Sequence, residues 1–132
     1  MTQLQRPRPS EARPSAFLFS PASRYPTPAA FVINDAGAVL HTWSHAAHQA
    51  RPEDNPPNNL RGWNHVAVDA NGSLFAVVPL QALLKLTPGS ELEWSCEIAA
   101  HHDLAFDESG AVLALTEAPR LVAVGGQPHV IL

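Results

Sequence analysis

The sequence predicts an all-β protein made of short antiparallel strands. Two observations lead to this fold class. Thirteen prolines and seven glycines in 132 residues separate short apolar runs, a punctuation typical of strands and turns rather than long helices. The hydrophobic share of 45% is enough for a core, and the charged share of 15% is too low for a disordered polyelectrolyte.

The N-terminal half contains an arm, a hairpin and a loop. Residues 1–15 are rich in Gln, Arg and Pro, which predicts a disordered arm. A short strand at 16–20 follows, and two apolar runs around Asp35-Ala36-Gly37, at 30–34 and 38–43, predict a hairpin. The polar, proline-rich stretch 44–62 reads as a long loop, a kind that is usually functional or disordered within a compact domain.

The rest of the chain predicts hairpins at a regular interval. They pair 65–69 with 73–78, 82–86 with 91–95, 103–107 with 111–115, and 120–124 with 129–132. A shift of 38 positions places Val66 on Leu104 and Gly72 on Gly110. Trp43 and Trp94 lie in the strands that end two successive units. Four strands in about 40 residues are typical of a β-propeller blade.

Residues 16–132 are therefore predicted to form one partial β-propeller domain of about two and a half to three four-stranded antiparallel blades. A closed propeller needs about 4–8 blades. The chain also stops on an apolar strand pattern without a polar capping unit. Both features predict an incomplete propeller, from a truncated gene product or a fragment.

Histidine is the unusual residue, with seven in the chain. His65 begins the first strand of one blade, and His101 and His102 begin the first strand of the next. Because first strands commonly line the central channel, these three histidines are the predicted catalytic residues. A neutral imidazole can move a proton, attack an electrophile or bind a metal. The alternative is that they only make hydrogen bonds where strands begin.

Two carboxylate interpretations accompany these histidines. If the strand around His102 is regular, Asp103 points to the opposite face and is a better partner for His101. Asp35, Asp69 and Asp107 precede turn glycines, where a carboxylate caps the backbone.

Other candidate residues predict no metal, cofactor or disulfide. His41, His45 and His48 have the spacing of three ligands on one helical face, but His41 lies in a predicted strand, so a solvated loop is favoured. Cys96 is the single cysteine, which excludes an internal disulfide, and its predicted strand suggests a buried structural thiol. Phosphate loops, nucleophile elbows and Cys/His zinc patterns are absent from the sequence.

Charge and hydropathy limit the partners. The net charge is −4 with a pI of about 5.9, which argues against nucleic acid. The apolar run at 16–19 is shorter than the roughly 7–15 residues of a secretory signal, and nothing approaches the roughly 18 of a membrane span. We therefore expect a cytoplasmic chain with no membrane partner.

Two segments resemble arylsulfotransferase-type (ASST-like) propellers, in their N-terminal part only. The runs 17–21 and 31–43 are similar to the opening of the family's first blade. The run 83–94, followed by Ala100-His101-His102-Asp103-Leu104, is similar to the next family pattern. The resemblance covers about residues 16 to 124, and His-His-Asp is its most specific element.

The resemblance implies sulfuryl transfer between phenolic compounds through a transient sulfohistidine, without a nucleotide cofactor. The substrate would be a phenolic sulfate. By motif, His102 and His101 are sulfate-site residues, and His65 joins them by the repeat. Because later blades are missing, this chain alone is expected to have weak or absent activity.

Two rival hypotheses stay open. One is a non-catalytic interaction module, in which exposed blade edges allow self-association and blades from two or more chains assemble one ring. The other is a metal-binding propeller that uses the histidines.

Overall fold

The protein is all-β and antiparallel, as the sequence predicts. The computed structural model describes residues 15–21, 24–118 and 120–131, so nearly all of the predicted arm at 1–15 lies outside the described residues. Two short 3-10 turns, Pro52–Asp54 and Asn58–Leu60, lie in the loop at 44–62. Within the described ranges, no helix is long and apolar enough to cross a membrane.

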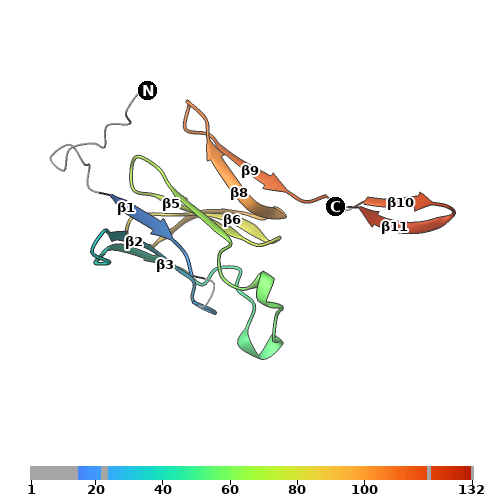
Figure 1. The fold of residues 1–132 in the computed structure, drawn as a ribbon, viewed down its shortest axis with the longest axis horizontal. Helices are drawn as coiled ribbons and strands as arrows, with labels where there is room; N and C mark the ends of the chain where they lie inside the picture. The colour runs from blue at the N-terminus through green and yellow to red at the C-terminus, as the bar shows by residue number, and fades with distance from the viewer. Residues whose placement is uncertain (1–14, 22–23, 119, 132) are drawn as a thin grey trace, which may run out of the picture.

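Eleven strands of the described chain form four sheets (Figure 1). The first sheet holds β1 (Ala16–Phe19), β2 (Ala29–Asn34) and β3 (Val39–Ser44). The second holds β4 (His65–Val68), β5 (Leu74–Val78), β6 (Ala82–Leu86) and β7 (Leu92–Cys96). The third holds β8 (Ala100–Phe106) and β9 (Val112–Thr116), and the fourth holds β10 (Arg120–Val124) and β11 (Gln127–Ile131).

The second sheet is the centre of the fold, with a sheet packed on each of its faces (Figure 1). Alternate residues of a strand point to opposite faces, so one set packs on the first sheet and the other on the third. The contact with the first sheet buries Leu74, Leu84 and Trp43. The contact with the third sheet buries Phe75, Val77, Leu83, Ala100 and Leu104.

The predicted four-stranded unit over 103–132 is wrong, whereas the three strands expected over 16–43 are present. The first sheet has three strands, and β10–β11 forms a separate hairpin that extends away from β9 (Figure 1). β10 lies 38 residues after β6, which pairs with β5. β6 differs from β10 because neighbouring strands and sheets cover it, and its residues Ala82, Leu84 and Leu86 are completely buried.

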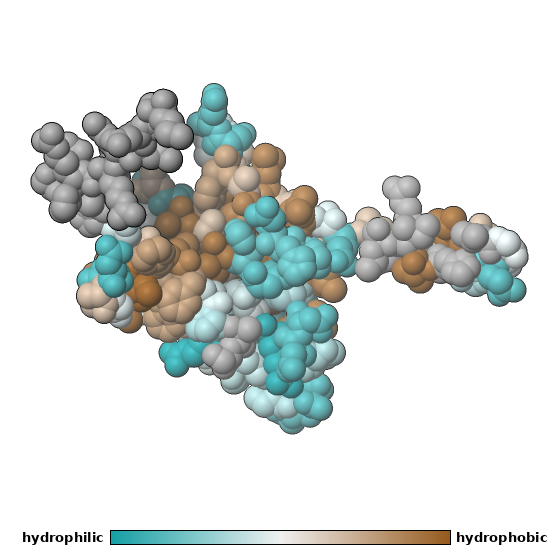
Figure 2. All heavy atoms as spheres, in the orientation of Figure 1, coloured by the Kyte–Doolittle hydropathy of each residue, from teal (hydrophilic) through white to brown (hydrophobic). Residues whose placement is uncertain are grey.

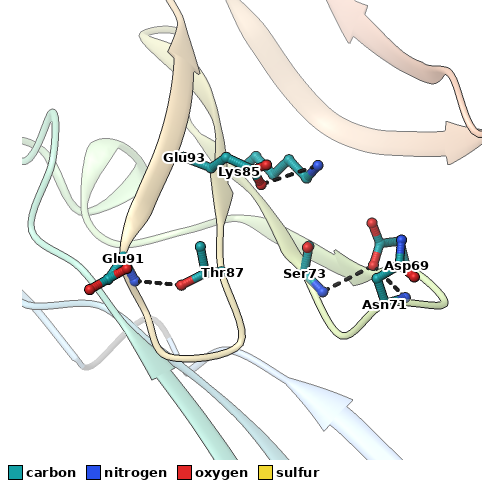
Figure 3. A network of polar contacts seen from close by, with 7 residues as sticks. All are labelled: Asp69, Asn71, Ser73, Lys85, Thr87, Glu91 and Glu93. Atoms are coloured by element: carbon teal, nitrogen blue, oxygen red, sulfur yellow. Dashed lines mark hydrogen bonds and ion pairs between the residues drawn. The ribbon is translucent and has the colours of Figure 1, made fainter.

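Four hairpin turns share one hydrogen-bonding pattern. In each, a side-chain oxygen accepts from the backbone N–H four residues later, and the residue three positions on has positive φ. The accepting residues are Asn34, Asp69, Thr87 and Asp107, and the positive-φ residues are Gly37, Gly72, Ser90 and Gly110. Figure 3 shows the Asp69 and Thr87 turns.

The predicted capping role is confirmed for Asp69 and Asp107 and is wrong for Asp35. Asn34, one residue earlier, accepts from Ala36 and Ala38 instead. A side-chain hydrogen bond from Ser109, followed by the backbone N–H of Ala111, holds the pKa of Asp107 below its ordinary value of 3.8. This contribution to stability is present above pH 3.8 and is lost as the pH falls through the lowered pKa.

Asp69→Ala is expected to lower the free energy of unfolding by about 1–2 kcal/mol. Its Oδ1 accepts from Asn71 N at 2.9 Å and Ser73 N at 3.0 Å, and both bonds are lost. Asp35→Ala is the control and should change stability by less than about 0.5 kcal/mol. Urea titrations monitored by tryptophan fluorescence measure both, and equal effects would contradict the turn assignment.

Candidate functional site

The predicted site residues His101 and His102 lie in a bulge of β8. Ala100 pairs with Thr116 and Leu104 pairs with Ala114, so three residues of β8 face the single residue Leu115. Ala100 and Leu104 are buried, which fixes the two ends of the bulge and leaves His101, His102 and Asp103 between them. Bulges of this kind redirect side chains and are common beside active sites.

His102 has a strained backbone and an exposed side chain. Its φ is 57°, in the left-handed region that residues other than glycine seldom adopt. Such strain is often retained at functional sites, where the surrounding structure holds the residue in place. The rings of His102 and His101 lie 3.7 Å apart between centroids and meet edge to face.

Glu117 orients His101, and sequence reasoning missed it. Glu117 Oε1 lies 2.9 Å from His101 Nε2, and the backbone N–H of Glu117 donates to Ala99 O at 3.0 Å. The carboxylate is thus fixed beside the residues that begin β8. A signal was present in the sequence, because an acidic residue directly follows the strand that pairs with β8 in a hairpin.

The expected pairing of Asp103 with His101 is wrong. Asp103 Oδ1 lies 3.7 Å from Nε2 of His65, at the start of β4, and also accepts from Leu104 N at 2.9 Å. The prediction assumed a regular strand, and the bulge breaks the alternation on which it depended. The structure thereby joins β4 and β8 through one histidine–carboxylate contact.

A hollow of about 230 Å³ adjoins His65 between β1 and β4. Its walls include Leu18 and Trp63, which can cover the face of a small ring. Two buried polar atoms near this hollow, Trp63 Nε1 and Asn64 Oδ1, have no hydrogen-bond partner within the described chain. No sequence signal indicated this hollow, because β1 and β4 lie far apart along the chain.

The histidine–carboxylate contacts define the chemistry available here. A carboxylate beside an imidazole fixes the orientation of the ring and stabilises its protonated form. His101–Glu117 and His65–Asp103 are two such pairs, whereas His102 has no carboxylate contact among the described residues. The arrangement therefore offers one exposed imidazole and two oriented ones on adjoining strands.

The three histidines near the loop have separate structural roles. His41 Nε2 lies 2.7 Å from Pro88 O, and His48 Nε2 lies 3.3 Å from Ser95 Oγ, so both connect the first sheet region to the second sheet. His45 Nδ1 accepts from Ala47 N. Among the described residues, no three metal-ligating side chains lie close enough together to hold an ion.

Cys96 is exposed, so the prediction of a buried thiol is wrong. It lies on β7, the outer strand of the second sheet, and every residue of that strand is exposed. Trp94 on the same strand is 37% exposed, whereas Trp43 is 3% exposed because β3 packs on the second sheet. The strand pattern indicated two apolar strands but not which of them a neighbouring sheet would cover.

Comparison with family models, with curated proteins and with solved structures gives no match to this chain.

Proposed function

We propose that the chain forms part of a β-propeller whose histidine site transfers a sulfuryl group between phenolic compounds. The observation that most supports this proposal is the β8 bulge. The bulge exposes His102 beside His101, whose ring is oriented by Glu117. The His-His-Asp run that resembles ASST-like propellers is the same run that occupies this bulge. Three sheets stacked face to face support the blade arrangement.

In the first half-reaction, an unprotonated ring nitrogen of His102 attacks the sulfur of an aryl sulfate. The N–S bond forms as the bond between sulfur and the aryl oxygen breaks. The phenolate leaves and takes a proton from water. When protonated, His101, whose ring lies beside that of His102, offsets negative charge on the sulfuryl oxygens, and we assign His65 the same role through its contact with Asp103.

In the second half-reaction, the oxygen of an acceptor phenol attacks the same sulfur. The N–S bond breaks, the new aryl sulfate leaves, and the phenolic proton passes to a carboxylate or water. Glu117 and Asp103 act by holding the two partner imidazoles. Two carboxylates also repel the sulfate, so turnover is expected to be slow unless both paired histidines are protonated.

Labelling tests this proposal more sensitively than turnover does. Incubation with ³⁵S-labelled p-nitrophenyl sulfate should leave label on the wild-type chain, and His102→Ala should reduce it to background. His45→Ala is the matched control, because the hydrogen bond of the His45 ring is to Ala47 in its own loop, and it should keep the wild-type label. An unlabelled wild-type chain, or label that survives His102→Ala, would remove His102 as the nucleophile.

The second candidate is a non-catalytic module that assembles with other chains. Its supporting observation is the exposed apolar surface on β9, where Leu113 is 60% and Leu115 is 61% exposed. The outer edge of β9 also has no paired strand among the described residues. Exposed edges and apolar sheet faces both recruit partners.

A further inference from the structure

The outer face of the third sheet carries apolar side chains that correspond, 38 residues later, to buried side chains of the second sheet. Leu113 and Leu115 lie 38 residues after Phe75 and Val77 of β5. Phe75 and Val77 bury themselves against β8 and β9. Leu113 and Leu115 occupy the same positions one unit later, and no described sheet covers them. This face is therefore equivalent to the face of the second sheet on which the third sheet packs.

The inner faces follow the same correspondence. Leu74 and Ala76 of the second sheet pack on the first sheet, and Val112 and Ala114, 38 residues later, pack on the second. The second sheet thus receives the third through the odd-numbered residues of β5, and the second and third sheets each cover the previous sheet through even-numbered residues. The stacking direction is set by strand alternation.

The first sheet has a face that no other described sheet covers, and this face would complete the stack. Leu18 and Val32 point toward the second sheet, so the alternate residues Phe17, Phe19 and Phe31 point away from it. Phe17 is 53% and Phe19 is 42% exposed, and the Phe19 and Phe31 rings lie 5.6 Å apart. Figure 2 shows apolar residues gathered over both the β1–β3 and the β8–β9 regions.

One residue of opposite charge borders each face, and the carboxylate of this pair also contacts His65. The guanidinium of Arg24 lies 5.5 Å from the Phe31 ring on the outer side of the first sheet. Asp103 borders a hollow of about 190 Å³ that Ala105, Leu113 and Leu115 also line on the third sheet. An aromatic face with a cation can thus meet an aliphatic face with a carboxylate.

We infer that the Leu113/Leu115 face of one copy binds the Phe17/Phe19 face of a second copy, head to tail. Two such contacts close a ring of two chains, and three stacked units from each chain make six, within the range of about 4–8 blades that closed propellers use. The inference specifies the association candidate above and does not depend on sulfuryl transfer.

Paired charge variants test this contact. Sedimentation velocity should show a wild-type dimer, and Leu113→Asp or Phe17→Asp should each weaken association on the order of a hundredfold. Leu92→Asp, at a 39% exposed residue of β7, should leave the dimer intact. The variants are expected to fold because the substituted side chains are already exposed. Circular dichroism should show the wild-type β spectrum for each of them.

Mixing the two interface variants distinguishes head-to-tail binding from every other mode. The Leu113→Asp chain keeps an intact aromatic face and the Phe17→Asp chain an intact aliphatic face, so an equimolar mixture should recover dimer through one intact contact. A monomeric wild-type chain would end both this inference and the association candidate. Association that resists Leu113→Asp, or a mixture that does not recover, would overturn the face contact and leave association through strand edges.

Discussion

Leu84→Ala is expected to lower the free energy of unfolding by about 2–5 kcal/mol. Leu84 lies at the middle of β6 with no exposed surface, in the cluster that joins the first and second sheets. Truncation removes buried methyl groups and leaves a cavity, because close-packed strands relax only partly. The loss should appear as a lower urea midpoint in tryptophan fluorescence.

Leu92→Ala is the matched control for this prediction. Leu92 is 39% exposed on the outer strand β7, so the same chemical change removes little buried surface. Its effect should stay below about 1 kcal/mol. Equal losses in the two variants would mean that the contact between the first and second sheets is not the stabilising core.

Gly72→Val is expected to cost about 1–3 kcal/mol. Gly72 has a φ of 80° in the β4–β5 turn, a conformation that a β-branched residue adopts only with strain. A Cβ there would lie 3.4 Å from Pro88 Cγ, an ordinary contact, so the Cβ itself adds no clash and the backbone strain is the expected cost.

Gly89→Val separates backbone strain from the general loss of a turn glycine. In the β6–β7 turn the positive φ of 68° belongs to Ser90, and Gly89 has no such requirement. Ser90 also has a second role in this turn, because its Oγ accepts a hydrogen bond from Ser44 N of β3 at 3.0 Å. Thermal melts should show a clear loss for Gly72→Val and little for Gly89→Val, and matching melts would refute the assignment of the strained position.

Much of the strand pattern could be predicted from the sequence. The expected hairpins at 65–78, 82–95, 103–115 and 120–132 correspond to β4–β5, β6–β7, β8–β9 and β10–β11. Alternating apolar residues and turn residues act over a few positions, so they are readable without knowledge of the neighbours. The start of β4 at His65, and the place of His101 and His102 at the start of β8, followed from the same signals.

The details of the candidate site depended on contacts that are distant in sequence. Asp103 faces His65 rather than His101 because two extra residues interrupt the regular strand geometry of β8 between the buried anchors Ala100 and Leu104. Glu117 reaches His101 only because β9 pairs with β8. The hollow beside His65 exists because β1 lies near β4.

By itself, the sequence determined an all-β chain of short hairpins and located the histidines at the starts of two strands. Local periodicity and turn chemistry are sufficient for that. Tertiary structure alone decided which faces are covered: it buries Trp43 and exposes Trp94 and Cys96, and it separates β10–β11 from β9. Whether an apolar strand is buried depends on whether a neighbouring sheet packs on it. The sequence pattern of the strand is the same in either case.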